Sequence, residues 1–281
     1  MMYIFKSIFF IFILSDLFSQ SSENSLIPGS DRSDGKGPYK RMVIRGATLI
    51  NGTGSPPIGP VDIVIENNRI LEVKSVGYPG VPINEKRRPK KGDFEIDASG
   101  HYVLPGFVDM HAHAGSVQKA PETDYVYKLW LAHGVTTVRG VGLGSLEFSL
   151  EEKARSKTNE ITAPRIWAYQ RPGQGNDWKG GAIRDPQNAR RWVRYVANKG
   201  VDGLKLVSYD PSIMAALIDE AKKQKLGTTA HLGQIGVARM NTVDAARLGL
   251  GTQTHFYGLF ESMYEKNDIQ PYPVEMNYNN E

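Results

Sequence analysis

The spacing of apolar and polar residues changes several times along this 281-residue chain, first near the N-terminus. Lys6 precedes an apolar run over residues 7–14, and a polar stretch begins at Ser19. The run is shorter than the roughly 20 residues needed to cross a bilayer, but it has the length of a secretory signal core. We therefore expect residues 1–22 to be a signal peptide that directs export to the periplasm or the medium and leaves no stable membrane anchor. A buried strand is the alternative.

The next change is from a polar linker to short strand-like segments. Residues 23–40 are rich in Ser, Gly and Asp, and β-branched residues then alternate with polar ones. Asn51-Gly52 and Asn67-Asn68 supply turns between these segments. Residues 41–101 therefore predict a small, antiparallel, β-sandwich-like domain. Its strand candidates are 42–44, 47–50, 61–65, 70–73 and 94–97.

From residue 102 onward, strand and helix patterns alternate with a period of roughly 25 to 35 residues, which is typical of βα units around a parallel sheet. The strand candidates are Phe107–Met110, Thr136–Val141, Arg165–Tyr169, Gly203–Val207, Thr228–His231 and Thr252–Phe256. Helical spacing is found in Asp124–Ala132, Asn188–Asn198, Pro211–Lys225 and Val237–Leu248. Residues 102–260 therefore predict an α/β fold, an incomplete TIM-like (β/α) barrel with about six of its eight units. Residues 261–281 predict an irregular tail.

Composition narrows the function classes. The formal net charge is +4, but the positive residues are scattered apart from one run over residues 86–91, which lies among Asn, Pro and Gly and is expected to be a solvated loop. No aromatic platform accompanies it, so we expect no nucleic-acid partner. The chain has no cysteine. Thiolate nucleophiles and cysteine metal sites are thereby excluded, and His, Asp, Glu and Lys remain as the strong metal ligands.

Candidate metal ligands follow or end several of the predicted strands. His111 and His113 come directly after an apolar strand, and alternate residues of an extended segment point to one side. Lys205, His231 and His255 stand at the ends of later strands, and each is separated from the next by one βα unit. In parallel barrels the carboxyl ends of the strands meet at one rim, where the chemistry takes place. The five side chains are therefore expected to meet there. Satisfied core histidines and a solvent-facing lysine are the alternatives.

The segment Pro105-Gly106-Phe107-Val108-Asp109-Met110-His111-Ala112-His113, with Asn51-Gly52-Thr53-Gly54 before it, resembles the amidohydrolase superfamily of metal-dependent hydrolases. The similarity extends from Met42 to about Phe260 and is greatest to an imidazolonepropionase-like and prolidase-like branch. Looser, correctly ordered matches are Gly200-Val201-Asp202-Gly203-Leu204-Lys205, Glu220-Ala221-Lys222 through His231, and Ala245-Ala246-Arg247-Leu248-Gly249 through His255.

The resemblance implies a role for each matching residue. His111 and His113 correspond to ligands of a buried metal, His231 and His255 to ligands of a more exposed one, and Lys205 to a lysine that is carbamylated and bridges the two. One or two divalent ions, zinc foremost, would activate a hydroxide for attack on a small-molecule or dipeptide substrate. The aspartate base that the family carries on its eighth strand has no counterpart here, because nothing after His255 has strand character. A C-terminally truncated barrel is therefore expected, and its catalytic base is unknown.

Other polar residues are assigned structural roles. His133 ends a helix and is expected to cap it, His101 follows a turn and is expected at the surface, and Asp109 is expected to support the histidine pair rather than bind metal. Arg139-Gly140 stands where the family often has an acidic residue. The Gly-rich segment 171–184 is either a cover over the substrate or a plain surface loop.

Three functions are consistent with these features. The first is hydrolysis of a carbon-nitrogen bond in an amide, a dipeptide or a cyclic amide. The second is an inactive, metal-binding partial barrel. The third is an ester or phosphoester hydrolase that uses the same metal chemistry. The sequence leaves the substrate, the metal and the oligomeric state open.

Overall fold

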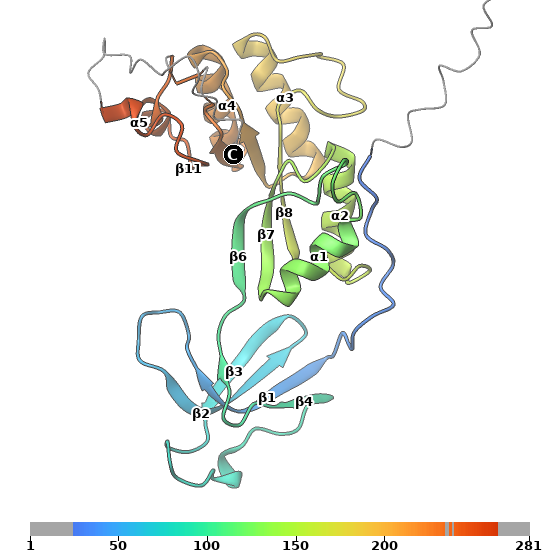
Figure 1. Cartoon of the computed structure of the whole chain (residues 1–281), viewed down its shortest axis with the longest axis vertical. Helices are drawn as coiled ribbons and strands as arrows, with labels where there is room; N and C mark the ends of the chain where they lie inside the picture. Colours follow the sequence, from blue (N-terminus) through green and yellow to red (C-terminus); the bar gives the residue numbers. More distant parts are fainter. Residues whose placement is uncertain (1–24, 234–235, 238, 264–281) are drawn as a thin grey trace, which may run out of the picture.

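The computed structural model describes residues 25–233, 236–237 and 239–263. The expected signal peptide and most of the expected C-terminal tail lie outside these residues. The described chain forms a small sheet and, beside it, a larger parallel sheet with helices (Figure 1). None of the described helices has the length and apolar character needed to cross a membrane.

The small sheet confirms the expected N-terminal β domain, with one correction to its topology. Its strands are β1 (Arg41–Leu49), β2 (Ile58–Glu66), β3 (Arg69–Ser75), β4 (Phe94–Asp97) and β5 (Tyr102–Val103). β1, β2 and β3 are antiparallel, but β4 and β5 pair with β1 in parallel, so the sheet is mixed. The two expected segments 42–44 and 47–50 form one strand, because Gly46 takes a φ of 71° and lets β1 continue through an irregularity.

The second sheet contains the six expected parallel strands in sequential order. They are β6 (Phe107–Ala112), β7 (Val135–Val141), β8 (Arg165–Gln170), β9 (Gly203–Leu206), β10 (Gly227–Ala230) and β11 (Thr252–Gln253). Each strand pairs in parallel with the next one along the chain. Sequential parallel strands joined by helices are the arrangement of a (β/α) barrel, and six of them form its curled part. The incomplete TIM-like barrel is confirmed.

Helices connect the strands and bury their apolar faces against the sheet. They are α1 (Thr123–Ala132), α2 (Leu146–Thr158), α3 (Pro186–Lys199), α4 (Pro211–Lys223) and α5 (Thr242–Arg247), with short 3-10 turns η1 (Glu85–Arg87) and η2 (Glu261–Met263). In α4 the predicted apolar face, including Met214 and Leu217, is buried, whereas Lys222 and Lys223 are exposed. Trp192 of α3 and Leu204 of β9 belong to the same core. This core also contains Leu206 of β9 and Ala230 of β10, so it supports the carboxyl ends of these two strands.

Two expected elements have different bounds, and one helix was not expected. The strand expected over 252–256 ends at Gln253, because the chain turns at His255, which takes a φ of 64°. The helix expected over 237–248 begins at Thr242, where Asn241 and Asp244 form a reciprocal capping box. α2 was not predicted, since it is mostly polar; it is delimited by its N-cap Ser145 and by Asn159, which takes a left-handed conformation at its end.

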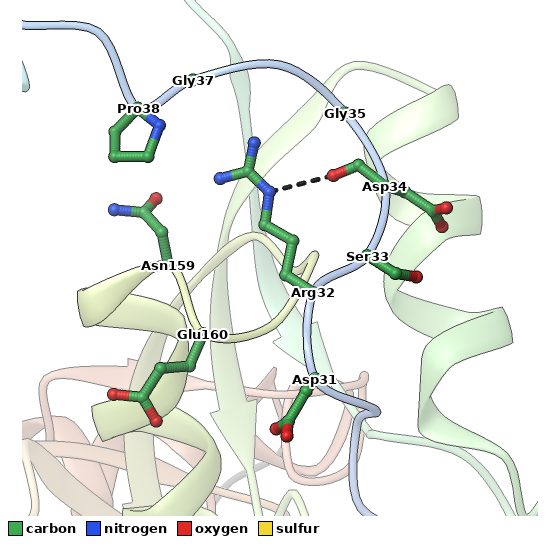
Figure 2. A pocket seen from close by; sticks show the side chains of 9 residues that line it. All are labelled: Asp31, Arg32, Ser33, Asp34, Gly35, Gly37, Pro38, Asn159 and Glu160. Carbon is green, nitrogen blue, oxygen red and sulfur yellow. Dashed lines mark hydrogen bonds between the residues drawn. The ribbon is translucent and has the colours of Figure 1, made fainter.

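The described part of the expected linker, residues 25–40, packs along the barrel helices instead of extending freely (Figure 1). The backbone N–H of Gly29 donates to the buried carboxylate of Glu152 at 3.0 Å. Farther along, Arg32 donates from Nε to the Asp34 carbonyl at 3.0 Å, which shapes a turn beside a surface cavity of about 490 Å³ (Figure 2). The basic run 86–91 is a largely exposed loop, as expected, although Arg88 pairs with the buried Asp62.

Candidate active site

The carboxyl ends of the parallel strands bring the predicted histidines together. His111 lies in β6, His113 just after it, His231 just after β10 and His255 just after β11. The ring centroids of His113 and His111 are 5.3 Å apart, those of His111 and His255 4.9 Å, and those of His255 and His231 4.7 Å. β6 and β11 are the two outer strands of this sheet, so the His111–His255 contact exists only because the sheet curls.

The hydrogen bonds of the first pair suit metal ligation. Nδ1 of His113 lies 3.3 Å from the Gly142 carbonyl oxygen, which can only accept, so Nδ1 carries the hydrogen and Nε2 keeps its lone pair. Metal-binding histidines commonly use one nitrogen in this way. Asp109 accepts a hydrogen bond from the His111 backbone N–H at 2.8 Å. Asp109 therefore supports the strand end, as predicted, rather than facing the imidazoles as a ligand.

Burial favours the uncharged form of the site histidines. Loss of solvation, the largest cause, and repulsion by Lys205, His113, His255 and Arg139 together lower the pKa of His111 to about 4. Burial also lowers the pKa of His113 and that of His231. An imidazole must be neutral to donate its lone pair to a metal, so the lowered pKa values leave these three side chains in the form that metal binding requires at neutral pH.

Lys205 lies beside the histidines and is buried, with 3% of its surface exposed. Its Nζ donates to the hydroxyl oxygen of Thr254 at 3.0 Å, and that hydroxyl donates to the Ala230 carbonyl. Burial lowers the pKa of Lys205 to about 8, with further contributions from the positive charges of Arg171 and Arg139. The amine is therefore much easier to deprotonate than an ordinary lysine, whose pKa is about 10.4.

The four imidazoles and the Lys205 amine have the chemistry to bind a divalent ion, but their nitrogen atoms do not surround a common point. Within the described residues, no group of three or more His, Asp or Glu side chains is placed to hold a metal as it stands. The four rings are adjacent, yet they contact one another edge to face or at a tilt. Neutral imidazoles are good ligands for zinc and related ions, so the chemistry of these side chains fits such an ion although their present geometry does not enclose one.

Arg139 is a site residue that the sequence analysis did not recognise as one. It is 7% exposed and crosses the concave side of the sheet, where Nε donates to the Met110 carbonyl at 2.7 Å. Its other nitrogens donate to the hydroxyls of Thr252 at 2.9 Å and Thr229 at 3.4 Å, and its guanidinium lies 5.2 Å from the centre of the Tyr169 ring. The signals in the sequence were a charged residue inside a predicted strand and its place where the family often has an acidic residue.

The other two predicted histidines lie away from this cluster, whereas the segment 171–184 begins beside it, at Arg171. His133 caps α1, and its Nδ1 contacts the Leu129 carbonyl at 2.8 Å, as expected. His101 is exposed, as expected. The segment 171–184 contacts the neighbouring helices: Asp177 accepts hydrogen bonds from Tyr195 and Lys199 of α3. It is therefore an ordered loop held against α3.

Comparison with known proteins identifies relatives over parts of the chain. No family model matches the chain. The adenine deaminase of Bacillus licheniformis is 30% identical over 204 residues, which cover 66% of this chain and 34% of that protein. A dihydroorotase of Thermoanaerobacter is 38% identical over 73 residues, 26% of this chain and 14% of that protein. The chain thus spans about a third or less of the length of these relatives.

Solved structures share the fold. A Xaa-Pro dipeptidase has a TM-score of 0.60 at 21% identity, over 79% of this chain and 63% of that one. A structure titled as an amidohydrolase has a TM-score of 0.56 at 20% identity, over 76% of this chain and 60% of that one. The partial barrel, the histidines at its rim and the sequence relatives agree, and they show that the chain belongs to the amidohydrolase superfamily.

Proposed function

We propose that this chain carries the metal site of a hydrolase that acts on carbon-nitrogen bonds. The observation that supports this most strongly is the meeting of His111, His113, His231, His255 and Lys205 at the carboxyl ends of four parallel strands. Chemistry in parallel barrels takes place at this end. The names of the relatives, adenine deaminase, dihydroorotase and Xaa-Pro dipeptidase, all refer to reactions at carbon-nitrogen bonds.

The four histidines would hold one or two divalent ions, for which zinc is the first candidate because nitrogen ligands suit it. A bound ion would polarise the scissile carbonyl group and make water more acidic. The chain's own contribution is to keep the imidazoles neutral by burial and to orient His113 through its Gly142 contact.

We further propose that Lys205 is carbamylated when metal is bound. A lysine ammonium repels a cation, whereas a carbamate offers two anionic oxygens, and only the neutral amine reacts with carbon dioxide. Lys205 is buried, and its pKa is lowered to about 8. Arg139 and Arg171, whose charges help to lower that pKa, would attract the anionic carbamate once it forms.

An assay with several bond types tests the proposal. The zinc-loaded chain is incubated with dipeptides, N-acyl amino acids, a cyclic amide, adenine, an ester and a phosphoester, and product release is followed. We expect hydrolysis of at least one carbon-nitrogen substrate and its loss in His111→Ala. Metal binding without turnover of any substrate would favour the inactive metal-binding barrel, and turnover of the esters alone would favour the ester or phosphoester hydrolase.

A further inference from the structure

Arg171 is the first residue after β8, so it lies at the same rim as the histidines. It borders a cavity of about 220 Å³ that is also lined by His113 and Gln174 and by the backbone of residues 142–144. The share of liquid volume taken by a water molecule is about 30 Å³, so the cavity has room for a small organic group. Because His113 is both a candidate metal ligand and a wall of the cavity, a molecule bound there would reach the metal site.

The guanidinium of Arg171 lies beside this cavity, and among the described residues it has no carboxylate partner. Within the described part of the chain, Arg171 forms no ion pair and no hydrogen bond, and it is exposed. Its side chain lies against the backbone of Gly142: a Cβ at that position would come within 3.1 Å of the Arg171 Nε. Gly142 also takes a φ of 73°, which disfavours any larger residue there. The backbone after β7 therefore leaves room for this arginine.

The residues that follow Arg171 keep this region in place. Gln170 is fully buried, and its amide nitrogen donates to the Gly144 carbonyl and to the side chain of Gln174. The Gln174 carbonyl accepts a hydrogen bond from the indole of the buried Trp192 at 2.9 Å. The backbone that carries Arg171 is therefore held in a fixed position beside the cavity.

The charge of Arg171 also acts on the site. Burial is the main cause of the lowered pKa values of His113, His231 and Lys205, and Arg171 lowers each of them further. Arg139, Arg171 and Lys205 thus make this part of the rim electropositive. An unpaired guanidinium in such a place favours a carboxylate, which it can bind through two parallel hydrogen bonds.

We propose that Arg171, with the side chain of Gln174, binds a carboxylate of the substrate on the His113 side of the metal site, in the cavity that residues 142–144 also line. This inference rests on the proposed function and narrows it: the substrate is an N-acyl amino acid or a dipeptide with a free carboxylate, and a small amino-acid portion occupies the cavity. Arg171 is a specificity residue in this arrangement, since it binds the end of the substrate and not the bond that breaks.

A binding experiment tests the inference without requiring turnover. The zinc-loaded chain is titrated with N-acetylglycine and with the uncharged N-acetylglycinamide, and the dissociation constants are measured by calorimetry or ligand-observed NMR. We expect the acid to bind about tenfold or more tightly than the amide, as a charge-assisted pair implies. Arg171→Gln should remove the preference and Arg171→Lys should keep part of it, because lysine retains the charge but not the two parallel donors.

The control variant is Arg69→Gln, which removes an exposed arginine from β3 of the small sheet and should keep the full preference. Equal binding of the acid and the amide by the unaltered chain, or a preference that survives Arg171→Gln in a folded protein, would overturn the inference. The proposed function can fail separately. If the chain binds the acid more tightly but hydrolyses no substrate, the carboxylate site is supported and the hydrolase is not. If it hydrolyses acid and amide substrates equally well, the hydrolase is supported and the carboxylate site is not.

Discussion

Arg139 of β7 donates a hydrogen bond to the hydroxyl of Thr252 in β11 at 2.9 Å, although three strands separate β7 from β11 in the sheet. The bond therefore spans the concave side instead of following the sheet. The same guanidinium contacts the Met110 carbonyl in β6 and the hydroxyl of Thr229 in β10. One side chain thus links both outer strands of the curled sheet, and we infer that it helps to set the curvature that brings His111 to His255.

Replacement of Arg139 should therefore lower stability and loosen the site. Arg139→Met removes three hydrogen bonds from a charged donor, and one such bond has a net contribution of about 1.5–3 kcal/mol, so we expect the free energy of unfolding in urea to fall by at least that amount. A double-mutant cycle with Thr252→Val isolates the bond across the sheet, and a coupling of about 0.5–1.5 kcal/mol is expected. Additive effects of the two substitutions would show that the contact contributes nothing.

Metal retention should depend on four of the six histidines. Alanine at His111, His113, His231 or His255 should lower zinc affinity by at least tenfold, since each substitution removes an imidazole nitrogen donor from the cluster. The matched controls are His101→Ala and His133→Ala, which change histidines outside it. Equilibrium dialysis with elemental analysis measures the bound zinc. If the control variants lose as much zinc affinity, the assignment of the four histidines as metal ligands is wrong.

The main elements of the fold could be predicted because their local signals agree with their packing. In α4 the apolar spacing of Met214 and Leu217 matches the buried face. The apolar segment before His111 forms β6 as expected, although its apolar side chains are largely exposed on this outer strand. The order of the ligands along the chain also predicted their meeting, since sequential parallel strands offer neighbouring carboxyl ends. These features depend on periodicity and topology, which are both visible in a sequence.

The rest could not be predicted because it depends on contacts between distant residues. The parallel pairing of β4 with β1 has no local signal, since a strand pattern does not state its direction. α2 is mostly polar, and one of its buried residues, Glu152, is satisfied by Gly29, 123 positions earlier in the chain. Arg139 reads as an ordinary charged residue until β11 is in place. Tertiary hydrogen bonds determine these parts of the structure.

Lys205 should react with carbon dioxide at a lower pH than an exposed lysine. Its pKa of about 8 leaves half of the amine neutral near pH 8, and the neutral fraction rises as the pH increases through that value. With ¹³C-labelled bicarbonate and zinc, we expect a carbamate signal in the carbon NMR spectrum that grows between about pH 7 and 9. Lys205→Met should abolish it, and Lys222→Met, on the exposed face of α4, should not. A signal that persists in Lys205→Met would assign the carbamate to another amine.

The loop over residues 171–184 should depend on Asp177. The Lys199 ammonium, 2.7 Å from its carboxylate, and the Tyr195 hydroxyl lower the pKa of Asp177 to about 2. A lowered carboxyl pKa stabilises the folded loop above the usual value near 3.9, and this stabilisation is lost as the pH falls toward 2. Asp177→Asn removes the charge at every pH. We therefore expect faster tryptic cleavage at Lys179 in Asp177→Asn at neutral pH, detected by mass spectrometry.

The matched control is Asp210→Asn, which removes an exposed carboxylate paired with Arg239 and does not touch the loop. Cleavage at Lys179 should stay at its original rate in that variant. Because Arg171 and Gln174 belong to the same loop, Asp177→Asn should also weaken binding of N-acetylglycine more than binding of its amide. If cleavage accelerates but the preference for the acid is unchanged, the turn at Gln170 and Gln174 holds Arg171 without help from Asp177, through the bond between Trp192 and the Gln174 carbonyl.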